Sequence, residues 1–577
     1  MLDLSKKTVK KESYKESHWL KELRKKYLSG QSIIFILHSN VLDLVQYEDT
    51  YITLKDFLLN ELLTKNKDIS IYFDESEGLV FGLPEMRKKF ISSINVRKAI
   101  SGESLISDPI SQSTSQTMAL FERVMEVPNQ STGIILGYSE TIVQSAEKMN
   151  YLTSTERANI ITVQRWANDP QMLNSDNLVI MISETLSDIN SKLVKNPQIC
   201  SIEIPMPDYE ERLDFIKYTI NKFPNVEFDL TIEQLANLTA GLRKIQIQGI
   251  FREASKIGEK ISYQQLNERK KVIIETECFD LVEVIETKHD LSSIGGMDYI
   301  KDYLNKVLKN IKSNNHSKVP MGMFFVGPMG TGKTYVAEAF AGESGMTCLK
   351  LKNFVNSLVG ATESNLEKIF SIVKALGYVL IIMDEVDRAL GDNKSESDGG
   401  TSSRVYAKIK AFMSDTTNRG KILWVMMSNR PDKLDIDLKR SGRFDSKIPF
   451  FYPQNQPEVE NLIKSLLKKN NINYEITDFE KISNLLINFS GADIEAIILS
   501  ASNNAYDKEK NILNDEEFLF AIEDFIPNRD SSMIEFMELL AVFECSSRSM
   551  LPEKYKDITN QELNEKIRNL KLINGLS

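Results

Sequence analysis

Cysteine and histidine are scarce in this chain of 577 residues, and their placement excludes two kinds of site. The four cysteines show no CxxC pair or other metal-ligand spacing, a pattern typical of core thiols in a reducing compartment. None of the four histidines belongs to an H-E-x-x-H motif, which excludes a fused zinc protease of that type. These residues are Cys200, Cys278, Cys348, Cys545, His18, His38, His289 and His316.

The chain also lacks an excess of positive charge and long hydrophobic runs. Lys and Arg number 71 against 81 Asp and Glu, a formal net charge of -10, which disfavours binding to a nucleic-acid backbone. The longest apolar runs, such as YVLIIM at 378–383, are too short to span a bilayer. The charged segment KKTVKKESYKES near the amino terminus does not resemble a signal peptide. We therefore expect a soluble, cytoplasmic protein that binds neither nucleic acid nor membrane.

What the sequence does contain is one glycine-rich loop, GPMGTGKT at 327–334, which matches the pattern G-x-x-x-x-G-K-[ST]. An expected strand, MGMFFV, precedes the loop and an expected helix, YVAEAFAGES, follows it, as the motif requires. The glycines let backbone N–H groups surround phosphate oxygens beside the positive end of the helix. Lys333 would reach the β- and γ-phosphates, and the Thr334 hydroxyl would bind Mg²⁺. The loop thus predicts a site for ATP and Mg²⁺.

Two later strand-like runs end in polar residues. YVLIIMDEVD ends in acids, of which Asp384 would hold Mg²⁺ through water and Glu385 would orient or deprotonate the attacking water. The run KILWVMMSN ends in Asn429, which could position the same water by a hydrogen bond. Shortly afterwards, LKRSGRFD carries Arg440 and Arg443. From their positions at the two strand ends, Glu385 and Asn429 are candidate catalytic groups.

Together these segments resemble the AAA ATPase family of the AAA+ superfamily, in the family's order from about residue 290 to 525. DLSSIGGMDYIKDYL, SSRVYAKIKAFMSD and SGADIEAIILSASNNA extend the resemblance beyond the motifs above. The resemblance implies a hexameric ring in which Arg440 and Arg443 reach the neighbouring subunit's nucleotide. It also implies a set of nucleotide contacts, namely Ile294, Gly295, Gly327, Pro328, Met329, Gly330, Thr331, Gly332, Lys333, Thr334, Tyr335, Asp384, Gly491 and Ala492.

The first half of the chain repeats the same order without the nucleotide-binding residues. NLVIMISE parallels ILWVMMSN at an offset of about 245 residues, so that Glu184 falls where Asn429 stands. GIILGYSE offers Gly137 and Tyr138 in place of the two acids, and IIFILHSN lacks both the glycines and the Lys-Thr pair. We interpret this half as a degenerate AAA-like module that keeps its packing pattern and serves a structural or partner-binding role.

The predicted fold class is therefore α/β, with two AAA+ modules in tandem, each a parallel sheet flanked by helices plus a helical lid. The degenerate module is expected at 31–285, with its lid from about 208, after an amino-terminal helical segment at 1–30. The ATPase module is expected at 286–455, with its lid at 456–527. A carboxy-terminal helical extension, 528–577, is expected to pack on the lid or on a neighbour.

Two segments bear on what such a ring would act on. Leu358-Val359-Gly360 stands where polypeptide-threading members of the family carry an aromatic-aliphatic-Gly pore loop. With leucine in place of the aromatic residue, it is either a weaker pore loop or a turn without substrate contact. The polar segment GDNKSESDGGTSS at 391–403 would be the second pore loop.

The leading hypothesis is an ATP-hydrolysing homo-oligomeric ring that remodels, unfolds or disassembles a protein substrate or complex. The alternative is an assembly factor or scaffold that hydrolyses slowly and whose nucleotide locks an oligomer onto a partner. A clamp-loader-like role on DNA ranks third because the chain is acidic.

Overall fold

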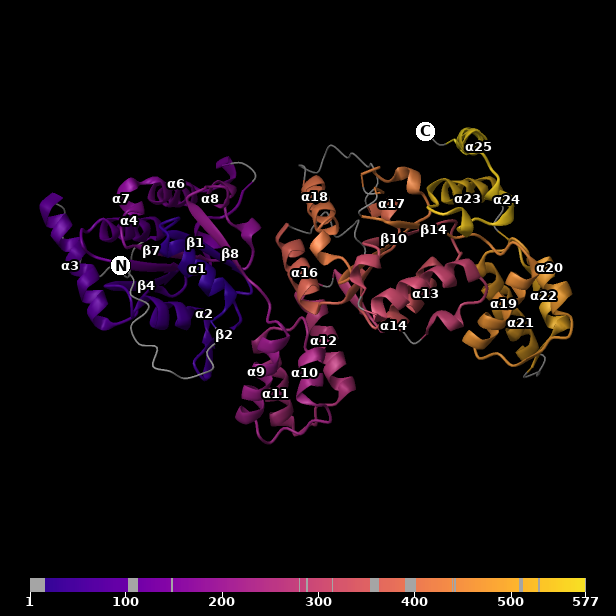
Figure 1. Cartoon of the computed structure of the whole chain (residues 1–577), viewed down its shortest axis with the longest axis horizontal. Coiled ribbons are helices and arrows are strands. Elements are labelled where there is room, and N and C mark those ends of the chain that lie inside the picture. Colours follow the sequence, from indigo (N-terminus) through magenta and orange to yellow (C-terminus); the bar gives the residue numbers. More distant parts are fainter. Residues whose placement is uncertain are drawn as a thin grey trace. The chain divides into compact units, whose positions relative to one another are not determined.

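The computed structural model describes residues 16–101, 113–146, 149–279, 281–286, 289–313, 315–352, 363–389, 401–437, 439–440, 443–507, 512–527 and 530–575. The chain divides into two compact units (Figure 1). The first comprises Met1–Ile273 with Glu363–Ala375, and the second comprises Ile274–Thr362 with Leu376–Ser577. Each unit is described separately below.

A six-stranded sheet forms the centre of the described part of the first unit. Its strands are β1 (Ile34–Ser39), β4 (Ile69–Asp74), β5 (Gly78–Phe81), β6 (Thr132–Leu136), β7 (Leu178–Ile182) and β8 (Ile199–Ile204). Their order is β5-β4-β6-β7-β1-β8, in which neighbouring strands are parallel except for the antiparallel edge strand β5. Near-continuous runs of buried apolar residues, such as those of β6 and β7, are typical of parallel strands covered on both faces.

Helices cover both faces of this sheet (Figure 1). Along β1 the side chains alternate, so that Ile34 and Ile36 join one core while Phe35 and Leu37 join the other. Strands β2 (Leu44–Tyr47) and β3 (Thr50–Thr53) form a separate hairpin. The helices of this part are α1 (His18–Leu28), α2 (Leu54–Asp56), η1 (Phe57–Leu63), α3 (Pro84–Ser101), α4 (Thr114–Met125), α5 (Ser139–Ile142), α6 (Ser154–Asn168), α7 (Pro170–Leu173) and α8 (Ser191–Val194).

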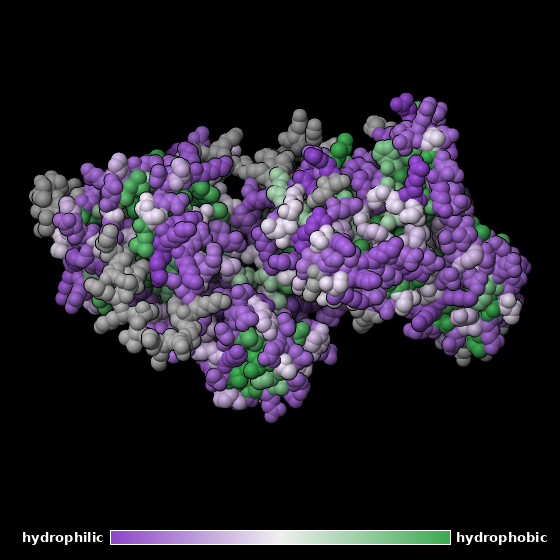
Figure 2. Space-filling model, in the orientation of Figure 1, coloured by the Kyte–Doolittle hydropathy of each residue, from purple (hydrophilic) through white to green (hydrophobic). Residues whose placement is uncertain are grey.

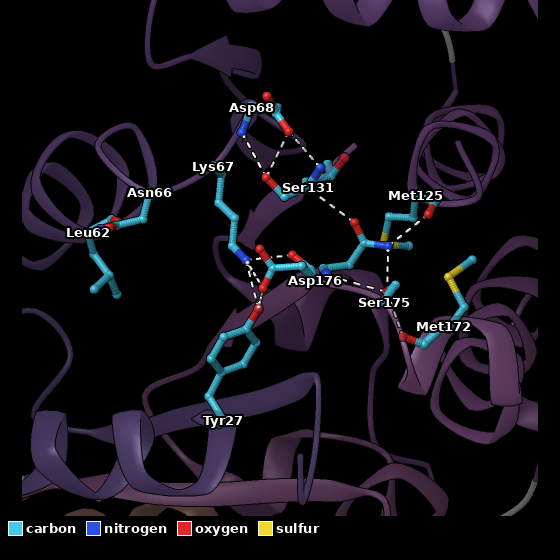
Figure 3. Close-up of polar contacts among 12 residues, drawn as sticks. Tyr27, Leu62, Asn66, Lys67, Asp68, Met125, Ser131, Met172, Ser175 and Asp176 are labelled. Carbon is cyan, nitrogen blue, oxygen red and sulfur yellow. Dashed lines mark hydrogen bonds and ion pairs between the residues drawn. The ribbon is translucent and has the colours of Figure 1, made fainter. Parts of the chain in front are cut away.

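A polar cluster fastens α1 to the amino-terminal edge of the sheet (Figure 3). Lys67, whose side chain is fully buried, donates to the Tyr27 hydroxyl at 2.7 Å and to the Asp176 carbonyl at 2.5 Å. Tyr27 in turn donates to the Asp176 carboxylate at 2.7 Å. Burial lowers the pKa of Lys67 and raises that of Tyr27. The cluster lies at the edge opposite the strand ends that would face a nucleotide.

The second unit contains a sheet of the same plan. Its strands are β9 (Val282–Ile285), β10 (Gly322–Val326), β11 (Thr347–Leu351), β12 (Val379–Met383), β13 (Ile422–Ser428) and β14 (Ser446–Pro449). In the order β9-β11-β12-β13-β10-β14 the five parallel strands follow the same sequence as in the first sheet. The antiparallel edge strand lies at the same side, but β9 precedes the other strands along the chain whereas β5 follows β4. The predicted pair of parallel sheets is therefore confirmed. The helices of this part are α13 (Asp298–Lys312), α14 (Lys333–Ser344), α17 (Val386–Ala389) and α18 (Thr401–Met413). Helix α16 (Glu363–Leu376) belongs, except for its last residue, to the first unit.

A helical bundle follows each sheet along the chain (Figure 1). The first bundle contains α9 (Tyr209–Lys222), α10 (Ile232–Leu238), α11 (Lys244–Ile257) and α12 (Tyr263–Glu277). The second bundle contains α19 (Gln456–Lys469), α20 (Phe479–Leu485), α21 (Gly491–Asp507) and α22 (Asp515–Asp524), with the short strands β15 (Tyr474–Glu475) and β16 (Leu513–Asn514). The second bundle has a core of its own, built around Ile463, Ile497 and Phe518. Apolar side chains interrupt the hydrophilic exterior of both bundles in Figure 2.

The carboxy-terminal extension consists of α23 (Ser531–Glu544), α24 (Glu553–Lys556) and α25 (Asn560–Ile573). Helix α23 packs against β14 and against η7 (Pro431–Lys433), which belong to the α/β part of the second unit. The sequence predicted that this segment packs on the lid or on a neighbour, whereas α23 packs on the α/β part of its own unit.

Candidate nucleotide site

The glycine-rich loop lies between β10 and α14, as the sequence predicted. Gly330 and Gly332 have φ angles of +76° and +82°, which a residue with a side chain adopts only under strain. A Cβ at Gly330 would also lie 2.8 Å from the Ser490 hydroxyl, so glycine is required there for close approach to the lid. Gly332 precedes the first helical residue, Lys333, and the N–H groups of this turn are the donors that phosphate oxygens require.

Lys333 is buried at the start of α14. Its ammonium donates to the carbonyls of Gly327 at 3.0 Å and Pro328 at 2.7 Å, while the Thr331 hydroxyl donates to Pro328 at 3.0 Å. Burial lowers the pKa of Lys333 to about 8, although Asp384 and Asp387 favour its charged form. The ammonium also lies 3.4 Å from the Thr331 hydroxyl, so its hydrogen-bond acceptors are two carbonyls and a hydroxyl, all of them neutral. A buried cation with such partners is a strong candidate partner for an anionic ligand.

Thr334 and Asp384 meet at the carboxyl edge of the sheet. The Thr334 hydroxyl donates to an Asp384 carboxylate oxygen at 2.9 Å, across a separation of 50 residues in sequence. Hydroxyl and carboxylate oxygens are hard ligands, and Mg²⁺ in such sites takes few protein ligands besides phosphates and water. The pair therefore fits Mg²⁺. Among the described residues, no group of three or more His, Cys, Asp and Glu side chains is placed to hold a metal ion.

The two candidate water-positioning residues lie beside this pair. Glu385 is exposed, has a φ angle of +47°, and donates its backbone N–H to Asp384 at 2.8 Å. Asn429 follows β13, and its neighbour Ser428 donates to Asp387 at 2.6 Å. The ends of two adjacent parallel strands, β12 and β13, thus bring Glu385 and Asn429 to one edge of the sheet.

A cavity of about 510 Å³ connects these groups with the lid. Its lining includes the candidate catalytic residues Glu385 and Asn429. It also includes most of the predicted nucleotide contacts, namely Ile294, Gly295, Met329, Gly330, Thr331, Gly332, Lys333, Thr334, Tyr335, Asp384, Gly491 and Ala492. Gly327 and Pro328 are not part of this lining but hold Lys333 through their carbonyls. The backbone N–H of Ala492, second residue of α21, donates to the Gly330 carbonyl at 3.3 Å and so joins the lid to the loop.

Beside the predicted contact Tyr335, the cavity is lined by Lys469 and Glu495, which the sequence did not single out. Tyr335 stacks on His289 with ring centroids 4.3 Å apart, and the Lys469 ammonium lies 5.1 Å from the Tyr335 ring. Lys469 also pairs with Glu495 at 2.8 Å, and both line the cavity. Lys469 and Glu495 are ordinary charged residues of predicted helices, so no spacing rule distinguishes them without tertiary contacts.

Neither candidate arginine lines this cavity. The Arg440 side chain is 73% exposed and contacts Asp437 only at 3.8 Å. Arg443, in contrast, is tied within its own unit, since its Nε donates to the Ser414 hydroxyl at 2.6 Å. Positions 438, 441 and 442 of the same segment lie outside the described residues, as do Leu358-Val359-Gly360 and 391–400 of the predicted pore loops.

The equivalent edge of the first unit has a smaller cavity of about 250 Å³. Tyr138 follows β6 with a φ angle of +47°, as Glu385 follows β12, so the backbone bend is retained after the acid is lost. A Cβ at Gly137, in the position of Asp384, would overlap the Tyr72 hydroxyl. Tyr72 also donates to Asp74 at 2.8 Å, so its ring is fixed where a metal-binding carboxylate would need space.

In the first unit a buried carboxylate connects the loop after β1 to the lid. Asp43 is 4% exposed and accepts the backbone N–H of Ile245 at 3.0 Å and the side-chain amide of Asn40 at 3.0 Å. Ile245 is the second residue of α11, just as Ala492 is the second residue of α21. The first unit thus joins its loop to its lid through a charged side chain of its own.

Comparisons with known proteins match both units. The family model described as "AAA+ chaperone, N-terminal Rossmann-like domain" matches residues 16–205, and that of the "AAA+ chaperone, second helical domain" matches residues 210–279. The model of the "ATPase family associated with various cellular activities (AAA)" matches residues 323–452. Together the three models cover most of the chain, and residues 280–322 and 453–577 lie outside them.

Several relatives align with the chain at low identity. The AAA domain-containing protein ycf46 of Gracilaria tenuistipitata var. liui is 26% identical over 67% of this chain and 81% of its own length. The peroxisomal ATPase PEX6 of Kluyveromyces lactis is 24% identical over 64% of this chain and 40% of its own length. The chloroplastic ATP-dependent zinc metalloprotease FTSH of Nicotiana tabacum is 29% identical over 47% of this chain and 40% of its own length. In the described part of the chain, no helix is both long and apolar enough to cross a membrane.

Proposed function

We propose that this chain, a member of the AAA+ family of ATPases, binds and hydrolyses ATP in its second unit and forms a homo-oligomeric ring that remodels a protein substrate or complex. The observation that supports this proposal most strongly is the convergence of Lys333, Thr334 and Asp384 on one cavity. Two elements of the chain supply these groups, since Lys333 and Thr334 begin α14 and Asp384 follows β12, and their chemistry is that of a phosphate and magnesium site.

The residues divide the work of hydrolysis among them. Lys333 exchanges its two carbonyl partners for phosphate oxygens and stabilises the charge that develops on them. Thr334 and Asp384 would hold Mg²⁺, which would neutralise phosphate charge when bound. Glu385 orients or deprotonates the attacking water, and Asn429 fixes that water by a hydrogen bond.

We assign the trans-acting role chiefly to Arg440, because it is exposed while Arg443 is held by Ser414. Arg440 would reach the nucleotide of a neighbouring copy, and Arg443 would fix the backbone of the segment. An arginine supplied in trans contributes about 10³- to 10⁵-fold in rate, so an isolated subunit would turn over very slowly. Each subunit then completes the site of the next one, and a head-to-tail arrangement of this kind closes into a ring, a hexamer by analogy with the family.

The first unit serves as a structural or partner-binding module that does not depend on nucleotide. Asp43 gives its loop a permanent link to the lid at the position where Ala492 meets the phosphate loop of the second unit. A second candidate function is a scaffold with slow hydrolysis, in which bound ATP locks the oligomer onto a partner. The relatives named as a peroxisomal ATPase and an ATP-dependent protease favour turnover over the scaffold.

The proposal is tested by Glu385→Gln, with ATP affinity and steady-state hydrolysis measured on the same preparation. The change removes the water-activating carboxylate and leaves Lys333 and Thr334 intact, so affinity is expected to stay within about threefold while turnover falls about 10²-fold or more. Glu140→Gln, at the matching edge of the first unit, is the control and should leave turnover unchanged. Undiminished hydrolysis by Glu385→Gln would remove that residue from its role.

A further inference from the structure

A buried carboxylate on the carboxy-terminal extension connects two segments of the catalytic module. Glu544 ends helix α23, and its side chain is only 6% exposed. It pairs with the Lys439 ammonium at 2.6 Å and with the Lys447 ammonium at 2.8 Å. Both carboxylate oxygens are thereby used, one for each lysine. Charge-assisted bonds of this length are among the stronger hydrogen bonds in proteins.

Lys439 places this contact next to the candidate catalytic arginine. It immediately precedes Arg440, and its ammonium also donates to the Pro431 carbonyl at 3.0 Å. Pro431 in turn lies two residues after Asn429. Lys439 therefore links the start of the arginine segment to the strand end that carries the water-positioning asparagine, and the carboxylate on α23 holds this lysine in place.

Other contacts hold α23 rigidly at this position. The Ser546 hydroxyl accepts the N–H of Lys447 at 3.0 Å, and the Ser546 N–H donates to the Lys447 carbonyl at 3.2 Å. The Arg430 guanidinium lies 5.1 Å from the centre of the Phe536 ring, and its Nε and Nη2 each donate to Asp432 at 2.9 Å. The anchor for Glu544 is thus a helix packed on the sheet rather than a loose tail.

Arg440 itself depends on its backbone for direction. Among the described residues its side chain makes one ion pair, at 3.8 Å to Asp437, and such an exposed i,i+3 pair contributes little. The position of the guanidinium is therefore governed by where Lys439 holds the chain. We propose that Glu544 is a positioning residue for hydrolysis in trans: through Lys439 it sets Arg440 for the nucleotide of a neighbouring copy of this chain. This inference rests on the proposed function, in which Arg440 acts between subunits.

The test separates subunits that donate the arginine from subunits that accept it. Arg440→Ala subunits keep a nucleotide site but lack the arginine, and Lys333→Ala subunits lack the site but keep the arginine. Each alone should be nearly inactive, and mixing them should restore ATP hydrolysis at interfaces where the second donates to the first. Glu544→Gln is then introduced into either partner of the mixture.

In the donor, Glu544→Gln should lower the restored rate about ten- to a hundredfold, because a displacement near 1 Å of a catalytic group has that effect. In the acceptor it should leave the restored rate within about twofold, which a general loss of folding would not do. Glu538→Gln is the matched control, since Glu538 lies on the same helix, is equally buried, and binds Lys554 and Tyr555 rather than the arginine segment. Introduced into the donor, it should preserve restoration.

The outcomes separate this inference from the function on which it rests. Full restoration by donors carrying Glu544→Gln, or equal losses in donor and acceptor, would overturn the positioning role alone. Failure of the unmodified mixture to recover activity would overturn the action of Arg440 between subunits, and the role of Glu544 with it. Lys439→Gln in the donor supplies an independent variant and should reproduce the defect, whereas Lys447→Gln should not.

Discussion

Replacing Asp43 by alanine should loosen the first unit where its loop meets its lid. The carboxylate accepts one N–H from Ile245 and one from Asn40, both at 3.0 Å, and is 4% exposed. A hydrogen bond to a charged group contributes about 1.5–3 kcal/mol. Ile245 is 44% exposed, so water can reach its amide once the carboxylate is gone. We therefore expect the lower end of the summed range, a loss of about 3 kcal/mol.

Hydrogen–deuterium exchange of the amides in α11 and α9 measures this loss locally. Opening that is about 3 kcal/mol easier corresponds to exchange more than a hundredfold faster, provided these helices open as a unit. Asp208→Ala is the control, because Asp208 caps α9 in the same bundle through the Glu211 N–H at 2.9 Å but does not reach the loop after β1. An exposed cap of this kind contributes about 1 kcal/mol. Equal exchange in the two variants, or no change with Asp43→Ala, would refute the link between loop and lid.

Two further predictions concern buried lysines. Burial lowers the pKa of Lys333 to about 8, whereas bound phosphates favour its charged form, so ATP binding above pH 8 should be accompanied by uptake of a proton. The affinity for ATP should therefore fall by up to tenfold per pH unit as the pH rises above 8. Calorimetry at pH 8.5 in buffers of different ionisation enthalpy measures the proton uptake, and an affinity independent of pH between 7 and 9.5 would contradict the prediction. Lys67→Met should lower the free energy of unfolding of the first unit by about 2 kcal/mol in denaturant titrations, because the Tyr27 hydroxyl and the Asp176 carbonyl lose their shared donor. Tyr27→Phe should have a smaller effect. An unchanged stability of the Lys67→Met variant would show that the cluster does not fasten α1.

Much of the fold was accessible from sequence because the signals were local. Buried runs such as FFV before the loop and VLIIM before Asp384 predicted the strands β10 and β12, and the internal repeat predicted a second parallel sheet. The phosphate loop was predicted because its glycines, Lys333 and Thr334 stand within eight positions of one another. These features depend on near neighbours along the chain.

The features that sequence reasoning missed depend on distant contacts. Asp43 and Ile245 are 202 residues apart, and Lys439 and Glu544 are 105 residues apart. An isolated Asp or Glu is most often a solvated surface residue, so nothing in the local pattern distinguishes these two. Their roles become visible only when the fold buries each carboxylate beside specific donors.

The central claim is that hydrolysis in the second unit is completed by a neighbouring copy, and the most direct test is the ATPase rate per chain as a function of protein concentration. A rate that rises steeply and then levels, in step with assembly measured by sedimentation, is the predicted result, and Arg440→Ala should flatten the rise while ATP binding persists. A substantial rate per chain that stays constant down to concentrations at which the protein sediments as a monomer would contradict the account.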